Sequence, residues 1–239
     1  MLRDVMPFDP FGDFDTRGYL RNSRSYKTTS AVKRFEHREY YRNIHLVRDY
    51  LAAASIIDYA ALLETHRLLF STVYPWAGDD RATLGIPTVI VKGRLHFATA
   101  AEIHRIASQG LTLASDPSIM AKQPGLLIGN LAFAHPFLEG NGRAFLAVQT
   151  ELARRAGISI DWRRIPFRQY LSELTREIVL PGEGHLDIFL TPYTKPNPDQ
   201  LILEQHQPDF SQPQSTTRKL AMSDPVLRGP LLDLTAARP

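Results

Sequence analysis

Nine consecutive residues, His135 to Arg143, combine side-chain types that together can handle a phosphate group. His135 is a base near neutral pH, and Glu139 is a hard carboxylate of the kind that holds Mg²⁺. Gly140 and Gly142 permit a positive φ and a close approach of a ligand to the backbone. Arg143 has a planar guanidinium group that matches phosphate oxygens. These groups suit the attack of a hydroxyl on phosphorus, so we predict an active site that handles the phosphates of a nucleotide.

The elements that must position this loop support the same chemistry. Helical patterns precede and follow it, so the loop runs into a helix whose free backbone N–H groups and positive dipole end attract an anion. Asn141 adds an amide donor, and Phe137 is expected to turn inward and anchor the loop. A tight turn between two helices would explain the glycines but not the His, Glu, Asn and Arg beside them. The loop also lacks the Gly-Lys-Ser/Thr ending of a Walker A motif.

The rest of the chain predicts a mainly α-helical body with one β-hairpin. Apolar residues recur at helical spacing over residues 30–54, 55–70, 99–113, 124–134, 143–155, 167–180 and 184–190. We expect the second of these helices to start at a capping box made by Ser55 and Asp58. Two short β-forming runs, 88–91 and 94–97, are separated by a glycine-containing turn and predict the hairpin.

Composition predicts three parts in the chain of 239 residues. Residues 1–28, rich in Gly and Asp with scattered aromatic residues, are expected to form a strap on the body. Residues 29–194 would form the helical domain. Eight of the 17 prolines lie from Pro192 onward, so residues 195–239 are expected to form a loosely ordered tail.

Composition and charge also limit the class of function. Hydrophobic residues make up 44% of the chain and charged residues 22%, which is enough for a sizeable core. The absence of cysteine excludes disulfides and thiolate metal sites and makes the cytoplasm the default compartment. No apolar run reaches the roughly 20 residues of a membrane span. The net charge is +3 and the basic residues are scattered, so nucleic acid is not the expected partner.

The nine-residue loop resembles the signature of the Fic-domain family, His-x-Phe-x-(Asp/Glu)-Gly-Asn-Gly-Arg, at every specified position. Three further stretches resemble the same family: residues 74–78 with Arg81, the hairpin with residues 92–98, and a leader at residues 12–22. The similarity covers about residues 11–194, and a motif with so many specified positions is specific. It implies a Fic-type helical bundle with a short β-hairpin flap.

By this resemblance the protein would be a bacterial nucleotidyltransferase that moves AMP from ATP to a Ser, Thr or Tyr hydroxyl of a target protein. His135 would take the hydroxyl proton and Glu139 would hold Mg²⁺. The phosphates would be bound by Gly140, Asn141, Gly142 and Arg143. The flap that would hold the target segment as an added strand consists of Thr88, Val89, Ile90, Val91 and Lys92. The expected compartment is the cytoplasm, and export into a host cell is left open.

Leu146 departs from the family pattern, which continues Arg-x-x-Arg. In the family this second arginine grips the γ-phosphate. A phosphotransferase, or a transferase with another donor such as UTP, therefore stays open, as does a catalytically silent Fic-fold binding module. The chain has no match to the family's inhibitory helix motif, (Ser/Thr)-x-x-x-Glu-(Gly/Asn), so we expect no built-in inhibitory helix. A separate inhibitory protein is compatible with the sequence.

Overall fold

The computed structural model describes residues 10–11, 18–86, 90–92 and 95–197. The helices are α2 (Thr29–Ala53), α3 (Tyr59–Phe70), α4 (Ile103–Ala114), α5 (Pro117–Lys122), α6 (Pro124–Ala134), α7 (Asn141–Arg155), α8 (Phe167–Val179) and α9 (His185–Leu190). The strands are β1 (Val91–Lys92), β2 (Leu95–His96), β3 (Ile158–Ile160) and β4 (Thr194–Pro196). Two 3₁₀ turns, Trp162–Arg164 and Thr191–Tyr193, complete these elements. The predicted mainly helical fold class is confirmed.

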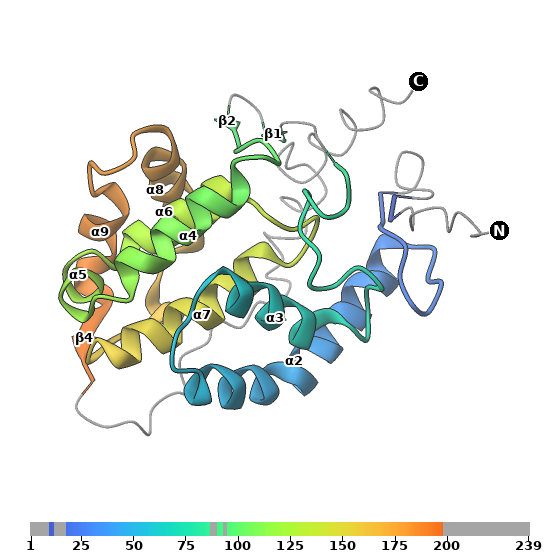
Figure 1. Ribbon diagram of the computed structural model, residues 1–239, viewed down its shortest axis with the longest axis horizontal. Helices are drawn as coiled ribbons and strands as arrows, with labels where there is room; N and C mark the ends of the chain where they lie inside the picture. The colour runs from blue at the N-terminus through green and yellow to red at the C-terminus, as the bar shows by residue number, and fades with distance from the viewer. Residues whose placement is uncertain (1–9, 12–17, 87–89, 93–94, 198–239) are drawn as a thin grey trace.

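The helices form two groups that meet where α6 contacts α7 and where α4 contacts α3. In one group α2, α3 and α7 contact one another, and in the other α6 contacts α4, α8 and α9 (Figure 1). Helix α6 is apolar on nearly all sides, as expected for a helix enclosed by others. Its buried residues are Pro124, Gly125, Leu127, Ile128, Gly129, Leu131, Ala132 and Ala134. The loop after α6 therefore starts from the centre of the body.

Glycines allow the helices around α6 to approach closely. A Cβ atom placed on Gly110 of α4 would lie 2.6 Å from the Cβ atom of Asn130 in α6. A Cβ atom on Gly129 would lie 2.7 Å from Cγ of Glu177 in α8. Real side-chain carbons do not come this close, so any larger residue would push these helices apart.

Strands β1 and β2 form the predicted hairpin. They pair antiparallel, with Val91 opposite His96. Phe97 extends the pairing by donating its N–H to the carbonyl of Ile90 at 2.9 Å, and both side chains are buried. The predicted flap residues Thr88 and Val89 lie outside the described residues.

The start of α3 differs from the prediction. Asp58 itself is the N-cap, and its side chain accepts the N–H of Ala61 at 2.9 Å. The capping box starting at Ser55 is therefore wrong. The physical reason is that Asp caps a helix as well as Ser does, and residues 55–57 form a non-helical link after α2.

One further helix start, one short helix and one small sheet were also not predicted correctly. Helix α4 begins at Ile103 instead of residue 99, because the carboxylate of Glu102 accepts the backbone N–H and the hydroxyl of Thr99 and holds a turn there. Helix α5 is a single short element started by Asp116 and was missed. The sheet of β3 and β4 was missed because each strand has only three residues and the partners lie far apart in sequence.

The ends of the helical body can be followed within the described residues. Phe11, Tyr19 and Leu20 are buried in the main core, so the described part of the N-terminal strap lies on the body. Strand β4 continues to Pro196, past residue 194, where the sequence placed the end of the domain. The remaining tail, residues 198–239, lies outside the described residues.

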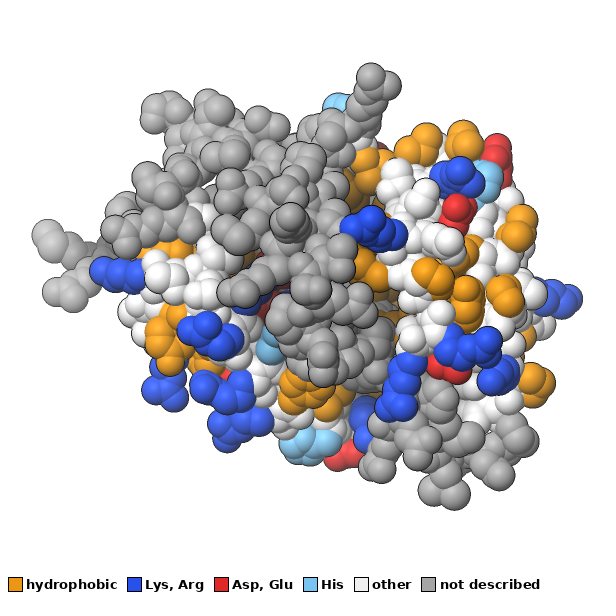
Figure 2. All heavy atoms as spheres, turned by 180° about the vertical axis from the view of Figure 1, so that it is seen from behind, with side chains coloured by type: hydrophobic (Ala, Val, Ile, Leu, Met, Phe, Trp, Pro, Cys, Tyr) orange, Lys and Arg blue, Asp and Glu red, His pale blue; other side chains and the backbone are white. Residues whose placement is uncertain are grey.

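Two properties of the surface and the helices bear on partners. On the face shown in Figure 2, the lysine and arginine side chains of the described residues stand in several separate groups, divided by hydrophobic and uncharged surface. Within the described ranges, none of the helices combines the length and apolarity needed to cross a membrane.

Candidate active site

The nine-residue loop joins α6 to α7. His135 is the C-cap of α6, and Gly140 is the N-cap of α7. The sequence placed the start of this helix at Arg143, but it begins two residues earlier, at Asn141. The residues from Asn141 to Arg143 thus form the first turn of α7, whose backbone N–H groups have no partner within the helix. The helix start that was predicted to attract an anion is therefore formed by residues of the nine-residue loop itself.

The backbone of His135 has a left-handed conformation, with φ 43° and ψ 57°. This conformation is uncommon for a residue with a side chain and persists only where the surroundings hold it. Arg81 does so: its Nε donates to the carbonyl of His135 at 2.8 Å, and its Nη2 donates to the carbonyls of Ala98 and Ala134. Arg81 is fully buried, and burial lowers its pKa to about 10, so the guanidinium stays charged at neutral pH.

The ring of His135 faces the first turn of α7. Its Nε2 lies 3.4 Å from the amide nitrogen of Asn141, which can only donate, so Nε2 is placed as an acceptor. The ring also packs on Phe97, with the ring centroids 4.6 Å apart. A ring nitrogen that acts as an acceptor in this place is of the kind that takes a proton from a hydroxyl in general base catalysis.

Asn141 is used mainly to hold the loop together. Its Oδ1 accepts the N–H of Phe137 at 2.9 Å, and its Nδ2 donates to the carbonyl of Phe137 at 2.6 Å. The side chain is buried. The sequence predicted an amide that binds a phosphate, and in the structure the polar atoms of this amide contact the backbone of the loop and His135.

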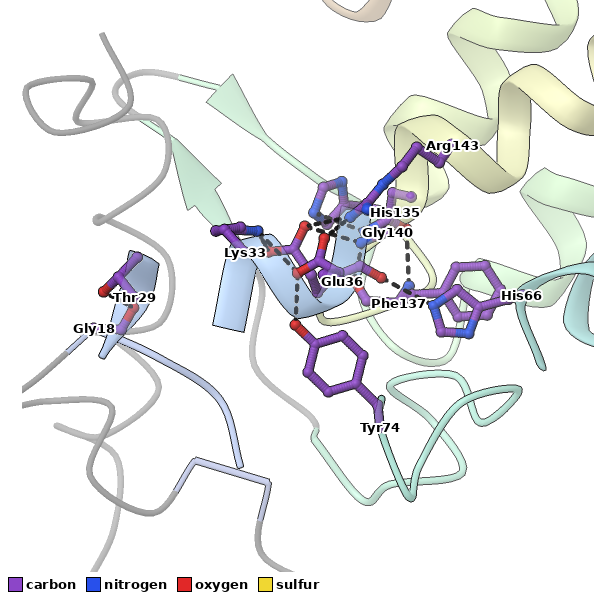
Figure 3. A network of polar contacts seen from close by, with 12 residues as sticks. Gly18, Thr29, Lys33, Glu36, His66, Tyr74, His135, Phe137, Gly140 and Arg143 are labelled. Carbon is purple, nitrogen blue, oxygen red and sulfur yellow. Dashed lines mark hydrogen bonds and ion pairs between the residues drawn. The ribbon is translucent and has the colours of Figure 1, made fainter. Parts of the chain in front are cut away.

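His66 of α3 contacts the loop and holds it in place. It was not predicted as a site residue. Its ring stacks on Phe137, which is fully buried, with centroids 3.8 Å apart and planes 8° apart (Figure 3). Gly78 donates its N–H to Nδ1 at 2.9 Å, so Nε2 carries the proton and donates to the carbonyl of Glu139 at 3.0 Å. Burial lowers the pKa of His66 to about 4, which keeps the ring neutral. In sequence only its place on the apolar face of a helix could be seen.

The two glycines of the loop have different roles in the fold. Gly140 has φ +80°, and a Cβ atom there would lie 2.5 Å from the ring of Phe70. Gly142 has no positive φ, and a Cβ atom there would meet nothing within 4 Å. The fold therefore requires glycine at 140 but not at 142. The open space at Gly142, on the first turn of α7, is room that a ligand could enter.

An ionic network lies between α2 and the loop (Figure 3). Glu36, whose side chain is 0% exposed, is ion-paired with Nη2 of Arg143 and accepts the hydroxyl of Tyr74 at 2.8 Å. Lys33 bridges the two carboxylates, with Nζ 3.2 Å from Glu36 and 2.9 Å from Glu139. Glu139 also lies 3.5 Å from Arg143. Glu139 and Arg143 were predicted from the sequence, but Lys33 and Glu36 were not, because their spacing resembles an ordinary ion pair on a helix surface.

Arg143 is held almost rigidly in this network. Its guanidinium lies over the ring of Phe70, 4.6 Å from the centroid, and over that of Tyr40 at 5.8 Å. Burial lowers its pKa to about 9, so it remains charged at neutral pH. Its Nη1 is buried without a hydrogen-bond partner among the described residues. A buried donor without a partner is costly, and a phosphate oxygen would satisfy it.

Glu139 is suited to a metal ion. Its side chain is 29% exposed, and its Oε1 accepts the N–H of Gly140 at 3.0 Å. In the part of the chain that the structure describes, no group of three or more metal-binding side chains is present. Mg²⁺ is commonly held by one or two carboxylates together with phosphate oxygens and water, so a single, partly exposed carboxylate in this loop fits this ion.

Leu146 lies one turn beyond Arg143 and is buried in a small apolar cluster. The other buried members of this cluster are Ile128, Ile160, Trp162, Leu186 and Leu190. The residue that departs from the motif is thus part of the packing between α7, α6 and the C-terminal elements.

The fold of this chain is similar to that of solved structures of other proteins. The BepC protein of Bartonella tribocorum, solved with bound AMPPNP, superposes with a TM-score of 0.65 at 20% identity, covering 76% of this chain and 94% of that one. The N-terminal Fic domain of a VirB-translocated Bep effector protein from Bartonella quintana, solved with bound ADP, superposes with a TM-score of 0.64 at 22% identity. The match covers 77% of this chain and 94% of that one. The fold is that of a Fic domain. The predicted helical bundle with a hairpin is confirmed by these structures.

Sequence comparison finds relatives with named activities. Protein adenylyltransferase VbhT of Bartonella schoenbuchensis is 32% identical over 193 residues, which are 75% of this chain and 37% of that protein. "Probable protein adenylyltransferase y4lH" of Sinorhizobium fredii is 30% identical over 129 residues, which are 50% of this chain and 65% of that protein. The chain thus spans less than two thirds of either relative. No protein-family profile matches the chain.

Proposed function

We propose that this chain is a Fic-family protein adenylyltransferase that transfers AMP from ATP to a Ser, Thr or Tyr hydroxyl of a target protein. The observation that carries the proposal is the convergence of three groups at one helix start. These are the acceptor nitrogen of His135, the carboxylate of Glu139, and the first turn of α7 with its open space at Gly142. The relatives named as adenylyltransferases and the nucleotide-bound Fic structures support the same activity.

The proposed reaction uses the residues of this site as follows. The target hydroxyl oxygen forms a bond to the α-phosphorus of ATP, the bond from that phosphorus to the β-phosphate oxygen breaks, and pyrophosphate leaves. Nε2 of His135 takes the hydroxyl proton. The backbone N–H groups of the first turn of α7 and the guanidinium of Arg143 bind phosphate oxygens. Glu139 would hold Mg²⁺, which when bound neutralises part of the phosphate charge.

We propose that the target segment docks on the hairpin as an added strand. Support comes from the position of this hairpin beside His135, the proposed base: Phe97 pairs with Ile90 and packs against the His135 ring. Such docking uses backbone hydrogen bonds and accepts varied target sequences. Bacterial cytoplasm is the proposed compartment, with export into a host cell left open, and a separate inhibitory protein remains compatible with the site.

A variant of the proposed base tests the function directly. Purified protein is incubated with labelled ATP, Mg²⁺ and a cell lysate, and labelled proteins are identified by mass spectrometry. We expect transfer by the native chain and a loss of about 10²–10⁴-fold in His135→Ala. His185→Ala removes a histidine of α9 that is paired with Glu183 and lies outside the loop, so transfer should be unchanged. Absence of label with the native chain, or equal label with His135→Ala, would contradict the proposal.

Leu146 supports a second candidate, a transferase that uses another nucleotide or transfers phosphate itself. Because Leu146 is buried in an apolar cluster, it offers no charge to a γ-phosphate. The mass added to the target decides between the candidates, since adenylyl, uridylyl and phosphoryl groups differ in mass. If no nucleotide raises the melting temperature of the protein, the chain is instead a binding module.

A further inference from the structure

Lys33 is the accessible cation of the ionic network. Its side chain is 42% exposed, whereas that of Arg143 is 11% exposed. Lys33 projects from the second turn of α2 toward the loop (Figure 3). Its Nζ lies 2.9 Å from Oε2 of Glu139. An ammonium group on a four-carbon stem can change partners with little cost, because its three donors rotate freely.

Arg143 cannot move in the same way. It is paired with the fully buried Glu36 and lies over the ring of Phe70 at 4.6 Å. Withdrawing it would leave the carboxylate of Glu36 buried with one cation fewer, which is strongly unfavourable. Arg143 therefore stays in its place and can bind only a phosphate group that lies at the first turn of α7.

The charges of the network allow Lys33 to exchange one of its partners when a ligand binds. Glu36 and Glu139 are balanced by Lys33 and Arg143, so the four groups sum to no net charge. If Glu139 turns to a divalent cation, its Oε2 gives up the contact of 2.9 Å with Lys33. The ammonium group is then free of that carboxylate and can bind an oxygen of an incoming polyphosphate, which attracts it.

We propose that Lys33 binds the outer phosphates of the nucleotide, exchanging Glu139 for a phosphate oxygen when the nucleotide binds. The inference rests on the proposed function and adds to it a specificity residue from α2. Leu146 supports it, because one turn beyond Arg143 the helix α7 offers an apolar side chain and no second cation. The site then selects nucleoside triphosphates or diphosphates over monophosphates by means of a lysine on another helix.

Binding measurements on substituted proteins test this inference. Calorimetric titrations with Mg²⁺-ATP and with AMP are made on the His135→Ala protein, which prevents turnover. Adding Lys33→Gln should weaken ATP binding about tenfold or more and AMP binding less than about twofold, because AMP has no outer phosphates. Lys33→Arg keeps the charge and should stay within about threefold of the parent. Lys122→Gln removes an exposed lysine at the end of α5 and should change neither affinity.

Chemical protection gives a readout that a purely structural lysine would not change. Lys33 should be acylated by an amine-reactive ester in the free protein, protected by Mg²⁺-ATP, and not protected by AMP. Lys122 serves as the internal reference in the same digest. Equal loss of ATP and AMP affinity in Lys33→Gln, unchanged ATP affinity, or acylation of Lys33 that ATP does not alter would each overturn the inference.

The experiments distinguish a failure of the Lys33 inference from a failure of the proposed transferase function. If ATP binds in a Lys33-dependent way but no protein is ever labelled, the transferase proposal fails and the inference stands. If proteins are labelled and Lys33→Gln labels them equally at limiting ATP, the inference fails and the transferase proposal stands. If the native chain binds no nucleotide, both fail.

Discussion

At the scale of single residues, the site depends on buried polar groups that were placed by α2 and α3. Glu36 balances Arg143, and His66 holds the backbone of the loop at the carbonyl of Glu139. Neither residue has to touch a substrate. Both make the loop rigid before a ligand arrives, which is what a site that stabilises developing charge needs.

Removal of the Glu36 carboxylate should be costly. In Glu36→Gln the buried guanidinium of Arg143 loses its closest counter-charge, so we expect the free energy of unfolding to fall by about 3 kcal/mol. Urea denaturation measures this change. Tyr74→Phe is the matched control, because it removes only the hydrogen bond of 2.8 Å to the same carboxylate and should cost about 1 kcal/mol. Equal and small losses in both variants would show that Arg143 does not depend on Glu36.

His66 should make stability depend on pH. Its pKa is about 4 in the folded protein and about 6.5 when unfolded, so between these values the unfolded chain binds more protons. Stability conferred by the neutral ring is therefore present above about pH 6.5 and is lost as the pH falls toward 4, by up to about 3 kcal/mol.

Denaturation of the native protein and of His66→Gln at several pH values measures this dependence. Because Gln can donate and accept a hydrogen bond but does not titrate, the difference in unfolding free energy between the two proteins should shrink as the pH falls. Parallel stability curves between about pH 7 and pH 4.5 would contradict the assignment.

At the scale of elements, the approach of α4 to α6 sets the position from which the loop starts. The pattern of apolar residues, with Pro124 as the first helical position, predicted a helix that ends at about residue 134, and α6 has these bounds. It did not predict the start of α4, since the side chain of Glu102 competes for the backbone at Thr99. Local competition of this kind has no signature in hydrophobic spacing.

Gly110 should not tolerate even alanine. The added Cβ would lie 2.6 Å from that of Asn130, so we expect Gly110→Ala to lower the free energy of unfolding by about 1–3 kcal/mol, although alanine favours a helix by about 1 kcal/mol. Gly142→Ala is the matched control: it also lies in a helix, but its Cβ would meet nothing within 4 Å, so stability should be unchanged or slightly higher. A stabilised Gly110→Ala protein would mean that α4 and α6 can separate freely.

At the scale of the whole molecule, we propose that the folded domain ends with β4. Strand β4 pairs with β3, with Ile158 opposite Pro196 and Ile160 opposite Thr194, and Asn197 donates its N–H to the carbonyl of Gly157 at 2.8 Å. This sheet connects the segment after α9 to the segment after α7, next to the apolar cluster that contains Leu146.

Two truncated chains test this boundary. A chain that ends after Asn197 should keep the unfolding midpoint of the full chain within about 2 °C, whereas one that ends after Tyr193 loses β4 and should unfold at least about 4 °C lower. Thermal unfolding followed by circular dichroism measures both. Equal midpoints for the two truncated chains would show that β4 does not belong to the folded domain.

The sequence by itself determined the chemistry of the loop and the class of fold. The types and spacing of His135, Glu139 and Arg143 define what the loop can do, because these side chains act within one short stretch of backbone. Helical periodicity predicted most of the bundle, because residues three and four apart share one face and this spacing is also local in the sequence. The Fic-domain fold that the resemblance of the loop implied agrees with the solved structures.

Only the tertiary structure decided what surrounds those residues. Lys33 and Glu36 meet the loop from a helix about a hundred residues earlier in the chain, and nothing in their local spacing distinguishes them from a solvated ion pair. Asn141 turned inward to hold Phe137, because its short side chain at the start of a helix can reach the backbone of the preceding turn. Partners that are distant in sequence depend on how helices pack, and packing is a property of the whole chain.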